Sequence, residues 1–381
     1  MSTDTVVVTG LGVVTPLGRT VDTFWEALVA GESAARAWDD LAAAGFRIPV
    51  ACRVAGFDAP AGERGQRMAI AAAGEAVAMA DHPLSGRTGL YVGTTMGESA
   101  RFERAAEGHP FDLTCAAANS FARAVRGALR LRGPARTYGT ACAAGNYAIG
   151  AGAEALRQGH VEAALVGGVD PFSRIAMVGF SRARAMSADR CRPFDRERSG
   201  MQLGEGAAFL LLERAESARR RGARPLATIG PLGLTGDAYH PTAPLPDGSG
   251  MAAAMENALA RAGLSPADVG WICAHGSGTR ASDAAEATAI RRVFGPTPPP
   301  VSGLKGALGH ALGAATAIEA VATVLALHHH ILPPTATVRE VDPDCGLDVV
   351  TEPRAAPRLR WALNCGFAFG GLNAALLIGA A

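Results

Sequence analysis

The sequence predicts a layered α/β protein whose sheets are buried on both faces. Short apolar runs of strand length alternate along the chain with longer stretches that suit helices. The strand-like runs are almost continuously apolar, which is typical of sheets covered by helices on both sides. The 381 residues, 49% of them hydrophobic, suffice for a large core. Because no low-complexity linker divides the chain, we expect two similar halves that meet near 230–250 rather than two independent domains.

The individual elements follow from local patterns. Residues 5–9 read Thr-Val-Val-Val-Thr, a β-branched run that predicts a buried strand. The other predicted strands are comparable apolar runs that end at turn residues, at 90–95, 137–141, 161–167, 206–213, 269–274, 301–304, 361–365 and 373–378. The predicted helices lie at 21–30, 67–80, 142–158 and 309–327.

Gly10 and Gly12 close the first predicted strand and could begin a dinucleotide-binding fingerprint. That fingerprint needs a third glycine where a helix begins. Thr15 and Pro16 stand at this place. The sequence therefore does not predict a nucleotide site here.

Charge and composition exclude further classes. A formal net charge of +1 argues against nucleic-acid binding, because phosphates require a concentrated basic surface. The first residues, Met-Ser-Thr-Asp-Thr, lack the basic and apolar regions of a signal peptide. The longest apolar stretch, 311–327, contains Glu319, so we expect a buried helix rather than a membrane span. Seven cysteines without a C-x-x-C pair suit reduced thiols in a cytoplasmic protein.

Lys305 is the single lysine among 36 basic residues, and the other 35 are arginines. A position that keeps lysine against such a bias indicates a need for an ammonium group. An ammonium differs from a guanidinium in size, hydration and hydrogen-bond geometry. Chance survival is the alternative, which the residues around Lys305 must decide.

Cys142 stands where a predicted strand runs into a predicted helix, among small residues only. A helix N-terminus stabilises a thiolate through its dipole and free N–H groups, and small neighbours leave room for a thioester carbonyl. Taken alone, a cysteine among Ala and Gly is more often a small core residue. Cys142 is therefore a candidate nucleophile whose role depends on the rest of the chain.

His275 and His310 lie on glycine-rich segments after predicted strands, which places them better for a cleft than for a core. Metal binding is the competing use. The chain contains no H-x-x-x-H, HExxH or C-x-x-C motif, so no metal site is predicted. The run at 328–330, three histidines, is interpreted as capping and surface residues at a helix end.

Several motifs occur together in order over nearly the whole chain, and with them the sequence resembles the β-ketoacyl-acyl-carrier-protein synthases of the thiolase superfamily, in their elongating branch. The motifs are Val-Thr-Gly-Leu-Gly-Val-Val-Thr-Pro-Leu-Gly (8–18), Gly-Thr-Ala-Cys-Ala-Ala-Gly (139–145), Arg-Pro-Phe-Asp (192–195), Leu-Gly-Glu-Gly (203–206), Asp-Ala-Tyr-His-Pro-Thr-Ala-Pro (237–244), Ala-His-Gly-Ser-Gly-Thr (274–279), Lys-Gly-Ala-Leu-Gly-His (305–310) and Gly-Phe-Ala-Phe-Gly-Gly-Leu-Asn (366–373).

The resemblance implies a thiolase-like αβαβα architecture, with a half at 1–231 carrying the nucleophile and a half at 232–381 carrying the histidines and lysine. It implies a decarboxylating carbon–carbon bond-forming activity that needs no metal or organic cofactor. The implied site residues are the triad Cys142, His275 and His310, the pair Lys305 and Glu319, the gate residue Phe369 with Phe367 in the same loop, and the loop residues Asp237 and Thr242. The implied partners are an acyl carrier protein, its acyl and malonyl thioesters, and a second subunit. That subunit is either a copy of this chain or resembles a chain-length factor. Because carrier proteins are usually acidic, an arginine-rich patch is expected at the entrance.

The chain departs from the family pattern in two ways. It is shorter, with losses around 57–67 and 97–130, and the second of these regions helps to build the dimer contact and the acyl pocket in the family. Ala368 replaces a glycine in the gate loop, which restricts positive φ there. The segments 276–279 and 342–348 are more similar to synthases of aromatic or polyene polyketides.

Two other readings of the chain stay open. The first is an acyltransferase or cyclase that is acylated but does not elongate. The second is a non-catalytic partner subunit of a ketosynthase heterodimer.

Overall fold

The fold is built on one ten-stranded sheet with the order β10-β9-β13-β14-β8-β1-β7-β6-β4-β5. The computed structural model describes residues 5–84, 86–111 and 117–381. The strands of the sheet are β1 (Val6–Val14), β4 (Thr88–Gly93), β5 (Ala135–Tyr138), β6 (Ala163–Asp170), β7 (Gly206–Arg214), β8 (Ala227–Gly236), β9 (Val269–Cys273), β10 (Val301–Ser302), β13 (Trp361–Ala368) and β14 (Leu372–Ala380). Two small ribbons pair β2 (Arg36–Ala37) with β3 (Val50–Ala51) and β11 (Ile331–Leu332) with β12 (Arg354–Ala355).

The helices of the described chain are α1 (Val21–Val29), α2 (Asp39–Ala43), α3 (Arg64–Ala80), α4 (Ala100–Ala106), α6 (Ser120–Ala128), α7 (Ala144–Arg157), α8 (Arg174–Arg182), α9 (Ala215–Arg220), α10 (Ser249–Ala262), α11 (Arg280–Phe294), α12 (Lys305–Leu308) and α13 (Ala315–His329). Two 3₁₀ turns matter for the site: η1 (Ala141–Ala143) precedes α7, and η3 (Leu312–Ala314) precedes α13.

The sheet consists of two halves with the same strand order. In one half β1, β7, β6, β4 and β5 follow one another, and in the other β8, β14, β13, β9 and β10 do. In each half, counted in this order, the first two strand pairings are antiparallel and the last two are parallel. Pairing of β1 with β8 joins the halves. The expected duplicated α/β architecture is thereby confirmed.

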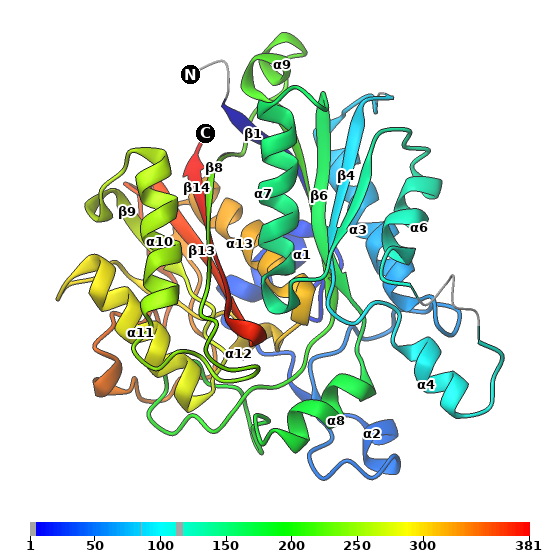
Figure 1. Cartoon of the computed structure of the whole chain (residues 1–381), viewed down its shortest axis with the longest axis vertical. Coiled ribbons are helices and arrows are strands. Elements are labelled where there is room, and N and C mark those ends of the chain that lie inside the picture. Colours follow the sequence, from blue (N-terminus) through cyan, green and yellow to red (C-terminus); the bar gives the residue numbers. More distant parts are fainter. Residues whose placement is uncertain (1–4, 85, 112–116) are drawn as a thin grey trace.

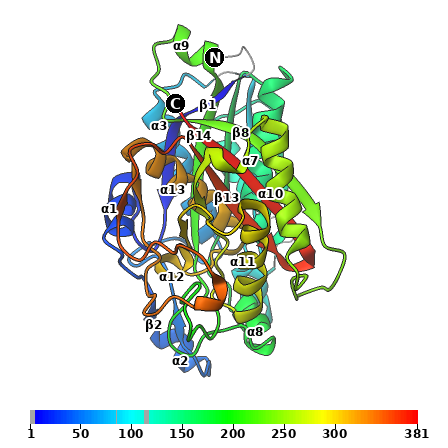
Figure 2. The same cartoon turned by 90° about the vertical axis from the view of Figure 1, so that its left-hand side faces the viewer.

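The helices form three layers around these half-sheets (Figure 1, Figure 2). α7 and α13 lie between the halves and share one apolar core with both. α3 and α6 cover the outer face of the first half, and α10 and α11 cover the outer face of the second. α13 is hydrophobic on nearly all sides because it is enclosed: 89% of the apolar segment Leu312–His329 is buried.

Corresponding glycines bring strand and outer helix together in each half. A Cβ on Gly12 would lie 2.0 Å from the carbonyl oxygen of Ala72 in α3. A Cβ on Gly233 would lie 1.9 Å from the carbonyl oxygen of Ala254 in α10. Gly12 therefore serves the close packing of β1 on α3. A nucleotide-binding motif is not needed to explain this glycine.

Several predicted boundaries were wrong. β1 continues through its glycines to Val14, and the strand expected at 137–141 is β5, which ends at Tyr138. The helix expected at 309–327 is α13, which begins only at Ala315. The residues before it, 305–314, form α12, a turn and η3. The strand β8 and the helices α10 and α11 were not predicted. The division at 231/232 falls within β8, the strand that joins the two halves through β1, and it stays a prediction.

We expect Gly12→Ala and Gly233→Ala each to destabilise the fold. The added methyl group must displace the carbonyl oxygen of Ala72 or Ala254, so the strand and helix have to separate. Overpacking of this kind costs about 2 kcal/mol. Thermal unfolding followed by circular dichroism measures the effect. Gly236→Ala is the matched control in β8, because no heavy atom lies within 4 Å of its added Cβ. An equal loss in the control contradicts the argument.

Candidate active site

A cavity of about 450 Å³ opens where the parallel strands of both halves end. The segments that follow β5, β9 and β10 all reach it, because the carboxyl ends of parallel strands meet at one edge of a sheet. Its walls include the predicted residues Cys142, Asp237, Thr242, His275, His310, Phe367 and Phe369. Lys305 and Glu319 are buried next to these walls.

Cys142 lies at the bend between β5 and α7, in the turn η1. The preceding residue, Ala141, has φ of 48°, a left-handed conformation that costs an L residue about 1 kcal/mol. The corresponding turn of the second half, η3, also begins with a left-handed residue, Leu312 with φ of 51°. The duplicated fold thus contains two similar bends, and only the first carries a thiol.

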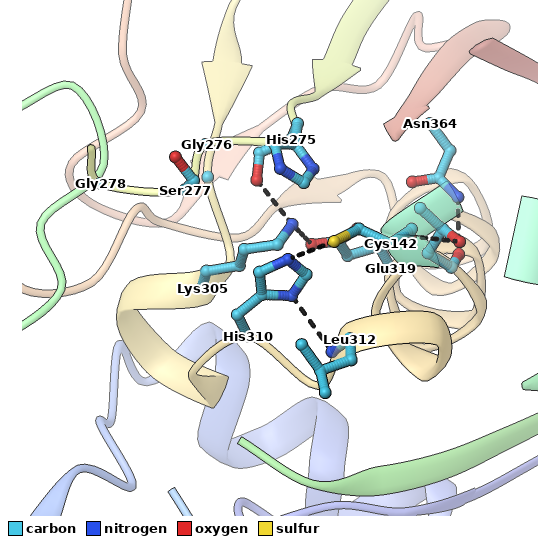
Figure 3. A network of polar contacts seen from close by, with 12 residues as sticks. Cys142, His275, Gly276, Ser277, Gly278, Lys305, His310, Leu312, Glu319 and Asn364 are labelled. Atoms are coloured by element: carbon cyan, nitrogen blue, oxygen red, sulfur yellow. Dashed lines mark hydrogen bonds and ion pairs between the residues drawn. The ribbon is translucent and has the colours of Figure 1, made fainter. Parts of the chain in front are cut away.

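His310 faces the thiol, with Nε2 3.0 Å from Sγ of Cys142 (Figure 3). The backbone N–H of Leu312 donates to Nδ1 of His310 at 3.2 Å. A neutral imidazole whose Nδ1 accepts must carry its hydrogen on Nε2. His310 therefore presents an N–H donor to the sulfur and to any oxygen that enters beside it.

Lys305 connects the segments that carry the two histidines. Its Nζ donates to the carbonyl oxygen of His275 at 2.6 Å and to Oε1 of Glu319 at 2.5 Å (Figure 3). The side chains of the pair are 1% and 2% exposed. Burial lowers the pKa of Lys305, but Glu319 outweighs it, and the net pKa is raised. The ammonium therefore stays charged.

His275 is held through its backbone rather than its ring. The buried carboxylate of Glu286, on α11, accepts the N–H groups of His275 at 2.7 Å and of Gly276 at 2.8 Å. Within the described residues, Nδ1 of the His275 ring has no hydrogen-bond partner. The ring packs edge to face against His310, with centroids 5.5 Å apart, so both imidazoles face the same space.

Asp170, at the end of β6, is a second buried side chain that, like Glu286, accepts hydrogen bonds from backbone N–H groups. Its two oxygens accept from the Thr94 hydroxyl and from the N–H groups of Thr95, Met96 and Gly313, at 2.7–2.9 Å. Gly313 follows Leu312, whose N–H fixes the ring of His310. Asp170 thus fixes the turn that sets the tautomer of His310.

Burial controls the protonation of the site. It raises the pKa of the Cys142 thiol to about 12, and the nearby Lys305 offsets only part of this. Burial, followed by the charge of Lys305, holds the pKa of His275 and of His310 well below 6.5. With these pKa values the cysteine is a thiol and both rings are neutral at pH 7. Burial of the sulfur thus opposes the thiolate that a helix N-terminus favours.

The mouth of the cavity is shaped by two loops. Phe369 is 39% exposed and packs against Phe180 of α8, with centroids 5.4 Å apart. Asp237 ties the loops together: its Oδ1 accepts from the Asn373 side chain at 2.6 Å and its N–H donates to the carbonyl oxygen of Gly371 at 2.9 Å. Thr242 is exposed beside them.

The gate loop keeps its left-handed residues away from Ala368. Gly370 and Gly371 have φ of 83° and 72°, whereas Ala368 is extended at φ of −111°. Alanine therefore fits its position in this conformation. Within the shortened segment 97–130, residues 112–116 lie outside the described residues.

The structure brings all nine predicted site residues to the cavity or its immediate support. Glu286, Asp170 and Phe180 were missed. Glu286 follows His275 by eleven residues, and only the prediction of α11 would have placed it at the site. Across the described residues no group of three or more His, Cys, Asp or Glu side chains forms a metal-binding cluster.

Comparison with known proteins gives the same picture. The sequence model "Beta-ketoacyl synthase, N-terminal domain" matches residues 3–218, and "Beta-ketoacyl synthase, C-terminal domain" matches residues 226–339. The tetracenomycin polyketide synthase ketoacyl synthase alpha subunit of Streptomyces glaucescens is 35% identical over 412 aligned positions, covering 98% of this chain and 96% of that protein.

Two solved structures are also similar. The ishigamide ketosynthase/chain length factor has a TM-score of 0.94 at 39% identity, with 100% of both chains covered. A type II polyketide acyl-carrier protein in complex with its ketosynthase, bound to the hexaketide, has a TM-score of 0.91 at 29% identity, with 99% of both chains covered.

Alkylation by iodoacetamide tests the state of the Cys142 thiol. Because burial raises its pKa to about 12, the alkylation rate should rise about tenfold per pH unit between pH 7 and 10 without a plateau. Peptide mass spectrometry, with Cys142→Ala as control, separates this thiol from the others. A plateau below pH 9 would show that the thiolate is the resting form.

Glu319→Gln should destabilise the protein strongly, since it leaves the buried ammonium of Lys305 without its counter-charge. Loss of one partner of a buried pair costs about 3–5 kcal/mol. The double variant Lys305→Met/Glu319→Leu removes both charges and should recover most of that stability. Thermal unfolding of the two variants is the measurement. A double variant as unstable as Glu319→Gln would rule out the uncompensated charge as the cause.

Proposed function

Because this chain belongs to the β-ketoacyl synthase family, we propose that Cys142, His275 and His310 carry out the decarboxylative condensation of an acyl group with a malonyl thioester. The observation that carries the proposal is the donor geometry of His310, whose Nε2–H points at Sγ of Cys142 from 3.0 Å while Nδ1 is occupied by Leu312. A donor fixed beside the nucleophile suits an oxygen that gains negative charge.

The first step transfers the acyl group to Cys142. The sulfur attacks the carbonyl carbon of an acyl-carrier thioester, a new C–S bond forms, and the carrier's C–S bond breaks. The proton of the thiol leaves with the carrier as its free thiol. Since His310 carries its hydrogen on Nε2, it stabilises the developing thiolate as a donor rather than acting as a base.

The second step is decarboxylation of the malonyl thioester. The bond between the α-carbon and the carboxylate breaks, CO₂ leaves, and the electron pair becomes an enolate. The neutral rings of His275 and His310 donate to the enolate oxygen. Neutral donors suit this task because they stabilise the negative charge without protonating the carbanion.

The third step forms the carbon–carbon bond. The α-carbon attacks the acyl carbonyl on Cys142, and the oxyanion accepts from the backbone N–H groups of Cys142 and Phe369. Collapse of this intermediate breaks the C–S bond and releases the β-ketoacyl carrier thioester. The sulfur of Cys142 leaves as a thiolate and takes up a proton from solvent, which replaces the proton that left with the first carrier. Lys305 serves as a fixed charge and spacer, since its ammonium is engaged by Glu319 and the His275 carbonyl.

The proposed organisation follows from these roles. The half at 1–231 carries the nucleophile, and the half at 232–381 carries the histidines and lysine. The substrates are thioesters of an acyl carrier protein in the cytoplasm. The active form is a dimer, either of two copies or with a subunit that resembles a chain length factor, which the similar ketosynthase/chain length factor supports. Polyketide extension is favoured over fatty-acid elongation by the relatives reported above.

An acyltransferase or cyclase that stops at the acylated cysteine is the second candidate, and a non-catalytic subunit is the third. The third lacks support, because a cysteine, two histidines and a buried lysine arranged around one cavity have no use in a scaffold. The first two candidates differ only in the malonyl step, so only an assay with malonyl thioester separates them.

Incubation with acyl and malonyl carrier-protein thioesters, followed by intact-protein and product mass spectrometry, tests the proposal. We expect an acyl adduct on Cys142 and a β-ketoacyl product extended by two carbons. Cys142→Ala should lower product formation by about 1,000-fold or more. An adduct without extended product favours the acyltransferase. Absence of both adduct and product favours the non-catalytic subunit.

A further inference from the structure

Gln202 is a buried polar side chain beside the segment that carries His310. The next residue, Leu203, pairs with His310 in an isolated parallel bridge. The N–H of His310 donates to the carbonyl oxygen of Gln202 at 2.7 Å. Gln202 is 1% exposed. Because a buried amide is costly unless its polar atoms are paired, the partners of this side chain indicate its role.

The side chain of Gln202 holds the loop at 189–191. Its Nε2 donates to the carbonyl oxygen of Asp189 at 2.5 Å, and its Oε1 accepts from the N–H of Cys191 at 3.3 Å. These two partners also fix the orientation of the amide, since a carbonyl only accepts and an N–H only donates. An apolar side chain of the same size could form neither bond.

Cys191 extends this contact to the loop of His275. Its thiol is buried and donates to the carbonyl oxygen of Ser277, with Sγ and the oxygen 3.3 Å apart. Burial raises the pKa of this thiol, so it keeps the proton that the hydrogen bond needs. Ser277 follows His275 by two residues on the same glycine-rich segment (Figure 3). A Cβ on Gly278 would lie 2.8 Å from Sγ, so the thiol packs tightly against that segment.

The positions of the two imidazoles are therefore connected by one continuous path. It runs from the backbone of His310 through the amide of Gln202, and then through the thiol of Cys191 to the other loop. The N–H of Gly200 also donates to that loop, at 3.0 Å. Because this second bond remains when the amide is removed, we expect a change in the spacing of the rings rather than an unfolded loop.

We propose that Gln202 is a positioning residue that sets the spacing of the imidazoles of His275 and His310 through Cys191. The inference rests on the proposed function, in which both rings donate to one enolate oxygen during decarboxylation. Acylation of Cys142 involves only His310, which faces the sulfur. An altered spacing therefore slows decarboxylation much more than acylation, because only decarboxylation needs both donors at one place. A general disturbance of the fold slows both steps.

The test follows the two steps separately in Gln202→Met and in Cys191→Ala. Decarboxylation of malonyl-N-acetylcysteamine should lose at least about tenfold in kcat, with KM changed by less than about twofold. Acylation of Cys142 by acetyl-N-acetylcysteamine, followed by intact-protein mass spectrometry, should slow by less than about threefold. Gln158→Met and Cys345→Ala are the matched controls, since Gln158 is exposed at the end of α7 and Cys345 is buried outside the cavity lining.

A double variant shows whether the two side chains act as one link. Because either single change breaks the path, Gln202→Met/Cys191→Ala should decarboxylate within about twofold of the slower single variant. A loss equal to the product of the two single losses overturns the proposal. Equal losses in acylation and decarboxylation, or no loss of decarboxylation, overturn it as well. If one single variant does not fold, the comparison of the two steps in the other decides.

Imidazole signals in ¹H–¹⁵N spectra need no substrate and keep this inference separate from the proposed function. The ring signals, assigned with His275→Ala and His310→Ala, should shift in Gln202→Met for at least one of the two histidines. Shifted signals in a protein whose wild type does not decarboxylate malonyl thioesters support the positioning role and count only against the proposed function. Unshifted signals of both rings overturn the positioning role.

Discussion

The buried ammonium of Lys305 joins three parts of the site that are distant in sequence. Its own helix, α12, precedes His310, its hydrogen bond to a carbonyl oxygen fixes the segment of His275, and its ion pair with Glu319 reaches the central helix α13. An arginine is longer and planar and could not make these two contacts in the same space. The relative positions of both histidines therefore depend on one charged group. The strong arginine bias of the chain spares this single position.

The same charge contributes to the chemistry around it. Burial disfavours the imidazolium form, and the positive charge of Lys305 adds to this, so His275 and His310 remain neutral donors. The thiol, by contrast, is buried more strongly than Lys305 can compensate. The site is thus prepared for negative charge that develops on a substrate oxygen rather than for a charged nucleophile at rest. Carboxylates hold the loops from outside the cavity: Glu286 holds the backbone at His275, and Asp170 holds the turn after His310.

Sequence reasoning recovered the parts of the molecule that leave a local signature. Cys142 became a candidate from its small neighbours at a strand end and Lys305 from the arginine bias, and the resemblance to the family then assigned both to the site. Their partners Glu286 and Asp170 were missed because a buried carboxylate that binds backbone N–H groups has no spacing rule relative to its targets. The helices α10 and α11 were missed although alanine favours a helix, because few large apolar side chains mark their buried faces. The effect of burial on the pKa of Cys142 could not be predicted for a related reason: desolvation depends on packing, which a linear pattern does not contain.

Duplication explains why one half supplies the thiol and the other supplies the histidines. The bends η1 and η3 occupy corresponding places before α7 and α13, and both begin with a left-handed residue. Thr316 of α13 accepts from the N–H of Asn146 in α7 at 3.0 Å, so the two bends are tied across the central layer. At the place of Cys142 the second bend has Gly313, where a Cβ would lie 2.6 Å from the backbone of Thr94. The second bend is thus too tightly packed for a nucleophile. The second bend contributes instead through the N–H of Leu312, the residue before Gly313. This N–H binds Nδ1 of His310, so that Nε2 faces the sulfur of Cys142 in the first bend.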